Sequence, residues 1–152
     1  MKLHSKSCLL DSFAWVMRLP PHVVATRVGH FGEDAGFHTQ ELIEAVLGCG
    51  WAVTAIERFP VAKNPDTFEV NPIEFAGGCE LRFSRHLRIR PGVLLGRTTI
   101  THRNHAVGWD NLSRMAYDPA IDRHITILDE DTNECDDKFF IPHTFLRMEH
   151  YE

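Results

Sequence analysis

The sequence has little that would assign it to a membrane, metal-binding or nucleic-acid-binding protein. No apolar run approaches the length of a membrane span. The four cysteines are irregularly spaced and include no Cys-X-X-Cys pair, which argues against a zinc ribbon and a disulfide framework. With 21 aspartates and glutamates against 16 lysines and arginines, the net charge of −5 argues against general nucleic-acid binding. We therefore expect neither membrane, nucleic acid nor cofactor among its partners.

The amino-terminal residues are not expected to act as a secretory signal. Lys2 and Lys6 precede Leu9 as in a signal peptide, but Asp11 interrupts the apolar segment, and no small-residue cleavage site follows. The sequence therefore predicts a cytoplasmic protein. Its 152 residues, 43% of them hydrophobic and 24% charged, suffice for a substantial core, so we expect a single domain over residues 1–152.

The first amphipathic helix is expected close to the amino terminus. Cys8 lies in its opening turn, and its apolar residues recur at helical spacing as far as Met17. Ser5 or Ser7 can cap its start, and Pro20-Pro21 end it.

Two further helices are expected before residue 50. One begins at Pro21 and ends before Gly29, because proline suits the first helical position and glycine suits the residue after the last. The other runs from a Thr39 cap to Leu47 and ends at Gly48.

The remainder of the chain is predicted to be mainly β-structure. The expected strands are Trp51–Ile56, Val93–Arg97, His105–Trp109, Arg114–Tyr117, His124–Leu128 and Lys138–Ile141. Prolines mark an excursion over 60–72, segment 79–90 is expected to be helical in its first half, and Pro142 is expected to open a short terminal helix. Helices thus come first, followed by strands whose connections are too short for parallel crossovers. The sequence predicts an α+β fold with N-terminal helices packed on a small antiparallel sheet.

Cys8 occupies the opening turn of the first expected helix. Backbone N–H groups lack helical partners there and the helix dipole is positive, conditions that favour a thiolate. A lone cysteine is more often a small buried apolar residue, so a nucleophilic role needs support from the rest of the chain.

A base and an orienting carboxylate follow on two successive expected strands. A thiol nucleophile needs a base within hydrogen-bond reach, and the base needs a third group that fixes its tautomer. The chain has ten histidines, so position must discriminate among them. His105 opens one strand and Asp118 closes the next, so pairing across the 110–113 turn would place both at one end of the sheet. We therefore expect Cys8 as nucleophile, His105 as base and Asp118 as its orienting partner.

This order of residues resembles the papain-like cysteine peptidases. A helix bearing Cys8, the strand His105–Trp109 and the sequence Tyr117-Asp118-Pro119 are most similar to the compact bacterial and phage branch around the double-glycine leader peptidases that mature bacteriocins. The resemblance spans residues 5–119. It implies a papain-like fold and a cysteine peptidase or isopeptidase that acts on a peptide or protein.

The chain departs from that family at the oxyanion donor. The family usually has a glutamine about six residues before the cysteine, but Lys2 stands there, and the only glutamine is Gln40. Lys2 and His4 are alternative donors. Two other functions stay open: side-chain deamidation or acyl transfer by the same triad, and an inactive papain-like module that binds a protein.

Other residues have competing interpretations. Asp110 is the rival of Asp118, although it follows the strand of His105 and belongs at its far end. His102 and His105 are spaced three apart, which on a strand gives opposite faces and argues against a shared metal. Histidines recur every eight residues at positions 22, 30 and 38, and we interpret them as polar residues of the surface or of loops.

The remaining functional residue types have structural interpretations. Cys49, Cys79 and Cys135 are expected to be structural. The tryptophans at 15, 51 and 109 are expected in the core, and Trp109 could also wall a substrate groove. The arginines at 82, 85, 88 and 90 form a solvated face or a docking surface for an acidic peptide or nucleic acid.

Overall fold

The computed structural model describes residues 7–32 and 36–151. The described residues form four helices: α1 (Cys8–Met17), α2 (Pro21–Val28), α3 (Thr39–Leu47) and α4 (Cys79–Ile89). They also form eight strands: β1 (Trp51–Glu57), β2 (Val61–Lys63), β3 (Val70–Pro72), β4 (Gly92–Thr98), β5 (Asn104–Asp110), β6 (Met115–Asp118), β7 (Arg123–Ile125) and β8 (Phe140–His150). No helix in this part of the chain has the length and apolar character needed to cross a membrane.

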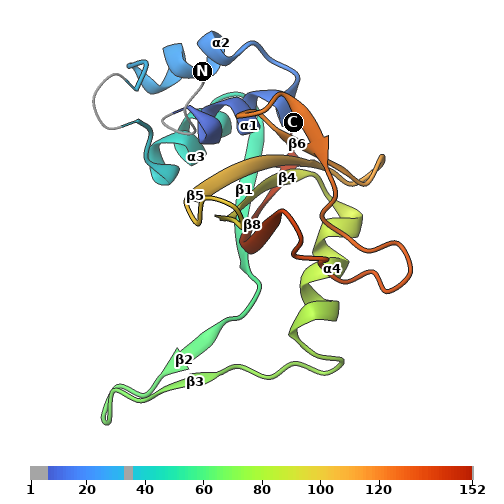
Figure 1. The fold of residues 1–152 in the computed structure, drawn as a ribbon. Coiled ribbons are helices and arrows are strands. Elements are labelled where there is room, and N and C mark those ends of the chain that lie inside the picture. The colour runs from blue at the N-terminus through green and yellow to red at the C-terminus, as the bar shows by residue number, and fades with distance from the viewer. Residues whose placement is uncertain (1–6, 33–35, 152) are drawn as a thin grey trace.

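Six strands form one antiparallel sheet in the order β1-β8-β4-β5-β6-β7 (Figure 1). The predicted α+β class with an antiparallel sheet is therefore confirmed. The last strand, β8, lies between β1 and β4, so a strand from the carboxyl-terminal end of the chain occupies an interior position of the sheet.

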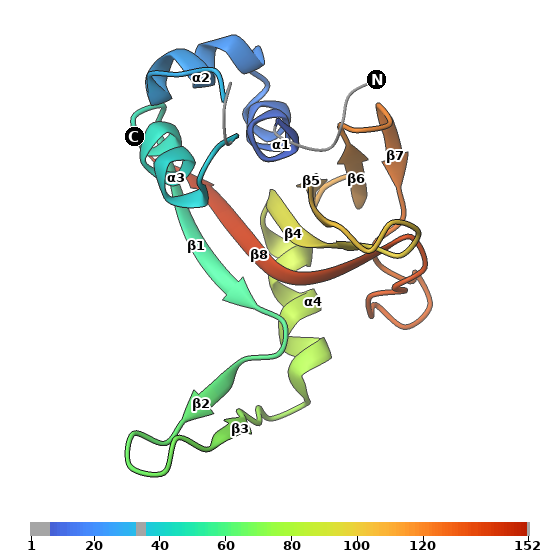
Figure 2. The same ribbon diagram turned by 60° about the vertical axis from the view of Figure 1, so that its left-hand side comes forward.

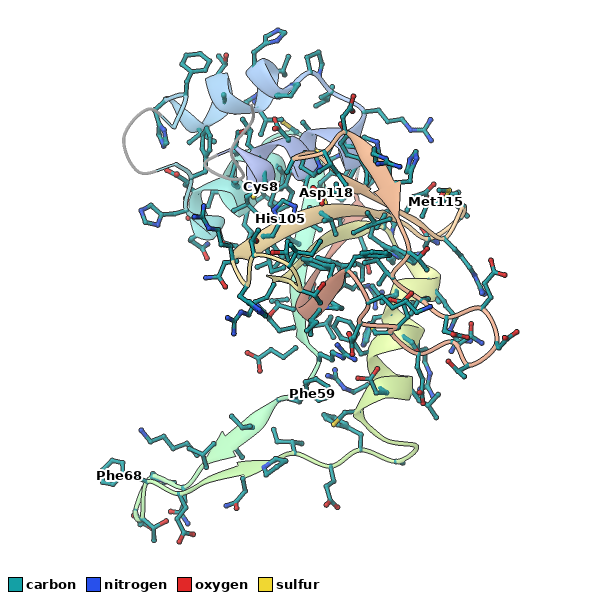
Figure 3. The ribbon with its side chains drawn as sticks, viewed as in Figure 1. Cys8, Phe59, Phe68, His105, Met115 and Asp118 are labelled. Atoms are coloured by element: carbon teal, nitrogen blue, oxygen red, sulfur yellow. The ribbon has the colours of Figure 1, made fainter. Side chains whose placement is uncertain are left out.

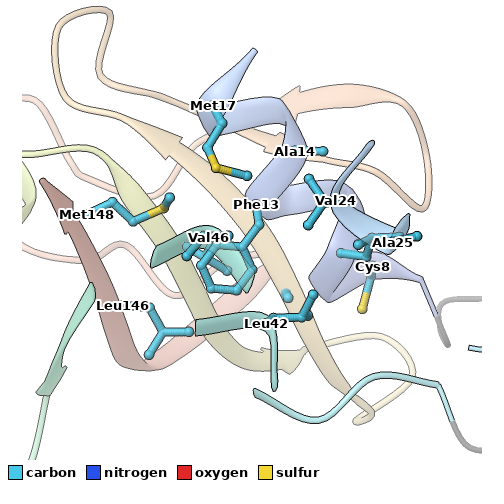
Figure 4. Close-up of a cluster of buried hydrophobic side chains, with 13 residues drawn as sticks. Cys8, Phe13, Ala14, Met17, Val24, Ala25, Leu42, Val46, Leu146 and Met148 are labelled. Atoms are coloured by element: carbon cyan, nitrogen blue, oxygen red, sulfur yellow. The ribbon is translucent and has the colours of Figure 1, made fainter. Parts of the chain in front are cut away.

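The sheet separates two hydrophobic cores. Helices α1, α2 and α3 cover one face, as predicted, whereas α4 packs on the opposite face (Figure 2). Successive side chains of a strand point to opposite faces of the sheet, so each strand contributes residues to both cores. Val93 and Ala106 belong to the first core, and Leu94 and Val107 belong to the second. Figure 4 shows Phe13 of α1 within the first core. The helix that carries Cys8 is thus fixed directly to the sheet.

The helix ends differ in detail from the prediction. Ser7 is the N-cap residue of α1, but its side chain makes no capping hydrogen bond. The N-cap of α3 is His38 and not Thr39, and the His38 N–H donates to Glu41 Oε1 at 2.8 Å. Helix α4 extends through both halves of its segment, from Cys79 to Ile89.

The predicted terminal helix after Pro142 is wrong. Residues 140–150 form β8, the longest strand, which pairs with β1 and β4. Pro142 is tolerated because the register shifts between Leu95 and Gly96: Thr144 lies opposite Leu95, and Pro142 opposite Gly96. His143 is consequently the extra residue of a β-bulge.

The proline-marked excursion is a hairpin arm that extends away from the body of the molecule (Figure 2). Strands β2 and β3 form it, and every residue in both is exposed. Arg58 anchors its base: the buried guanidinium donates to Glu80 at 2.5 Å and to both carboxylate oxygens of Asp137 at 2.8 and 2.9 Å.

Candidate active site

Helix α1 presents Cys8 at its first residue. Cys8 is 9% exposed, and its carbonyl oxygen accepts a hydrogen bond from the buried Ser12 hydroxyl at 2.7 Å. Phe13 and Met17 fasten the following turns into the first core. The thiol therefore lies at the positive end of a well-anchored helix.

A glycine lets this helix approach β5 closely. A Cβ atom added to Gly108 would lie 2.5 Å from the ring of Trp15, closer than non-bonded carbons approach. Trp15 also stacks on Tyr117 of β6, with ring centroids 5.4 Å apart. The contacts of Trp15 set the position of α1 over the strands that carry His105 and Asp118.

The predicted pairing of β5 with β6 brings His105 and Asp118 together. Asp118 Oδ1 lies 2.6 Å from His105 Nε2 and also accepts the backbone N–H of Ala120 at 2.9 Å. Both residues are buried, with 5% and 8% of their surfaces exposed. The backbone that follows Asp118 thus fixes its carboxylate, and the carboxylate orients the imidazole ring of His105.

His105 also interacts with the Cys8 thiol, so the structure brings all three predicted residues together (Figure 3). Burial alone would lower the pKa of His105. Hydrogen bonds to Asp118 and Cys8, together with the electrostatic attraction of these two side chains, outweigh burial and raise it to about 9. His105 therefore keeps its proton at neutral pH beside the Cys8 sulfur.

The thiol borders a pocket of about 280 Å³. Its lining includes three polar side chains that the sequence did not assign to the site: Thr39 at the start of α3, Asn104 at the start of β5, and His143 at the bulge of β8. The position of Asn104 beside His105 in the sequence is a signal that could have identified it. His143 had no such signal, since its segment was predicted to be helical.

Other predicted site residues lie elsewhere. Asp110 caps the turn at the far end of β5, where its carboxylate accepts the Leu112 N–H and the Ser113 hydroxyl at 3.1 and 2.8 Å. Lys2 and His4, the alternative oxyanion donors, lie outside the described residues, as does Ser5.

The other cysteines differ chemically from Cys8. None of the four, all within the described ranges, forms a disulfide. Burial, reinforced by nearby carboxylates, raises the pKa of Cys135 to about 12 although Arg58 opposes it. Cys79 donates to the Ile73 carbonyl at 3.4 Å, and Cys49 packs against the first core. These contacts agree with structural roles.

The histidines of the described residues form no recognisable metal site. Within residues 7–32 and 36–151, no group of three histidine, cysteine or acidic side chains is placed to hold a metal ion. His30 instead contacts both carboxylate oxygens of Glu41, at 3.0 and 3.1 Å, and stacks on Phe37. His30 therefore connects the segment after α2 to Phe37 and to α3.

The tryptophans and arginines contribute mainly to structure. Trp109 is fully buried and donates its indole N–H to the Leu87 carbonyl at 2.6 Å, whereas Trp15 and Trp51 are only partly buried. Arg82 covers the Phe75 ring at 4.5 Å, and Arg90 lies 3.7 Å from Glu149. Two of the four clustered arginines thus have partners within the chain.

Comparison with known proteins gives no function for this chain, so a function has to be inferred from the geometry of the site. No family model matches the chain, and neither a curated protein nor a solved structure shows a significant match.

Proposed function

We propose that the protein is a papain-like cysteine peptidase or isopeptidase that attacks a peptide or amide carbonyl through Cys8. The observation that carries this proposal is the placement of His105, which contacts the Cys8 thiol and also lies 2.6 Å from Asp118. Nucleophile, base and orienting group come from α1, β5 and β6, in the order that the papain-like resemblance implies.

The arrangement supports two-stage acyl transfer. Cys8 sulfur, as thiolate, bonds to the carbonyl carbon, and the carbonyl electron pair moves to oxygen. When that pair returns, the carbon–nitrogen bond breaks and protonated His105 gives its proton to the leaving nitrogen. Neutral His105 then removes a proton from water, whose oxygen attacks the thioester and releases the acid and the Cys8 thiolate. Asp118 keeps the ring oriented throughout.

The oxyanion requires a hydrogen-bond donor near Cys8. Of the described residues that line the thiol pocket, Asn104 alone carries a side-chain amide, the group that the missing glutamine would supply. Asn104 is exposed and adjoins His105, so its amide can reach solvent-borne substrate at the mouth of the pocket. We assign it as the side-chain oxyanion donor.

The masses of the products formed from peptide and protein substrates test the proposal and separate its alternatives. We would incubate the protein with a proteome-derived peptide mixture and with a glutamine-rich protein, and compare it with Cys8→Ala and His105→Ala. A peptidase adds water across a cleaved bond, a deamidase changes an intact chain by one mass unit, and a transferase joins two components. Turnover that survives in Cys8→Ala would overturn the proposal. An inert module would give no product although Cys8 and His105 are in place.

A further inference from the structure

A second cavity adjoins the catalytic pair on the side of Asp118. It has a volume of about 420 Å³ and is bordered by both His105 and Asp118. Its walls come from the β4–β5 connection, the β6–β7 connection, β7 itself and the start of β8, so it lies at the same end of the sheet as the pair. This volume suits one or two amino-acid side chains.

Exposed apolar side chains from three separate segments surround this cavity. Ile100 is 82% exposed, Ile121 53% and Phe139 58%, and Phe140 is buried beside them. Single exposed apolar residues are ordinary on protein surfaces, but a cluster around a concavity marks a binding site. The edge-to-face contact of Phe140 with His105, at a centroid distance of 6.2 Å, connects this apolar surface to the base.

His105 separates the two cavities. Cys8 lines the first cavity and not the second, Asp118 lines the second and not the first, and His105 lines both. In the proposed reaction, His105 gives its proton to the leaving nitrogen, so the leaving group must lie on the His105 side of the sulfur. The part of the substrate beyond that nitrogen is then directed toward the apolar cavity.

We propose that this second cavity binds the apolar side chain of the amine that leaves in the first stage. This inference rests on the proposed acyl transfer and adds its substrate class: amides whose amine component is a large aliphatic or aromatic residue. An occupied cavity also keeps water from the His105–Asp118 pair, which strengthens their hydrogen bond.

Aminolysis of an acetyl-enzyme tests this inference by microscopic reversibility. p-Nitrophenyl acetate transfers its acetyl group to Cys8 sulfur and releases p-nitrophenolate. The acetyl-enzyme then partitions between water and an added amine, whose nitrogen attacks the thioester carbonyl while His105 takes its proton. Mass spectrometry measures N-acetyl-leucinamide and N-acetyl-glycinamide formed at equal concentrations of leucinamide and glycinamide. We expect leucinamide to be favoured by roughly tenfold or more, and phenylalaninamide likewise.

Ile121→Asp places a charge in the cavity and should bring the leucinamide to glycinamide ratio close to one. Leu112→Asp is the matched control: Leu112 is 88% exposed, lies at the β5–β6 turn away from this cavity, and should leave the ratio unchanged. Free amines also react directly with p-nitrophenyl acetate, so the ratio is taken after subtraction of the products formed under the same conditions with Cys8→Ala. A wild-type ratio near one, or a ratio unaffected by Ile121→Asp, overturns the inference while leaving the proposed function intact. Failure of Cys8 to form an acetyl-enzyme, with Cys8→Ala as reference, overturns both.

Discussion

The indole ring of Trp15 lies so close to Gly108 that no side chain fits between α1 and β5 at this point: a Cβ atom there would be 2.5 Å from the ring. Gly108 belongs to the strand that carries His105, and Trp15 to the helix that carries Cys8. The Trp15–Gly108 contact therefore sets the spacing between the elements of the nucleophile and its base.

Gly108→Ala should displace α1 from β5. Overpacking of this kind costs about 1–3 kcal/mol of unfolding free energy, and a displacement near 1 Å lowers the rate of a positioned reaction by about 10². Urea unfolding and the rate of Cys8 acetylation measure the two effects. The double variant Gly108→Ala with Trp15→Leu should recover part of both, because the smaller side chain makes room. Equal loss in the single and double variants would refute the positioning role of the contact.

Asn104→Ala should lower the turnover of amide substrates by about 10²–10³, the usual effect of removing one oxyanion donor. The loss should appear in kcat, since the bond to the oxyanion forms only in the transition state. His143→Ala provides a control from the same pocket and should have a smaller effect. If His143→Ala causes the large loss and Asn104→Ala does not, the donor has been wrongly assigned.

The raised pKa of His105 makes folding stability depend on pH. The ordinary pKa of 6.5 applies in the unfolded chain and about 9 in the folded one, so the folded state binds more protons between these values. The stabilisation is fully present below pH 6.5 and is lost as pH rises through 9, a change of about 3 kcal/mol. Urea unfolding at pH 6 to 10 should show this fall in the wild type and not in His105→Gln. A parallel fall in both would exclude His105 as its source.

Arg58→Met should destabilise the protein by roughly 3 kcal/mol, because it leaves Glu80 and Asp137 without the cation that both contact. Arg58→Lys should lose less, since it keeps the charge but not the two-pronged geometry. The exposed Arg85→Met is the matched control on α4. Chemical unfolding measures the differences. Equal stability of Arg58→Met and Arg85→Met would show that the arm base needs no ion pair.

Local signals were sufficient to predict the elements that carry the site. Apolar residues at helical spacing up to Met17, followed by Pro20 and Pro21, mark α1, and the short 110–113 turn makes β5 and β6 neighbours. Adjacent pairing then brings His105 and Asp118 to one end without knowledge of the rest of the fold. The contact of Cys8 with His105 required α1 to cross β5, which the sequence indicated only through the family resemblance.

The rest depends on long-range packing. Proline normally interrupts a strand. The bulge opposite Leu95 and Gly96 allows β8 to continue past Pro142 between β1 and β4. The same bulge brings His143 to the thiol pocket. Helix α4 packs on the opposite face because that face of the strands is left uncovered by the other helices. Local sequence patterns do not reveal which face of a strand stays uncovered.

Alkylation of Cys8 tests the central claim most directly. Iodoacetamide is reacted with the native protein from pH 5 to 10, and the modified cysteine is identified by mass spectrometry, with His105→Ala and Asp118→Asn in parallel. We predict that Cys8 reacts faster than a model thiol below pH 8, that His105→Ala removes this advantage, and that Asp118→Asn reduces it. A Cys8 that reacts no faster than a model thiol, and is unaffected by the loss of His105, would contradict the proposed nucleophile.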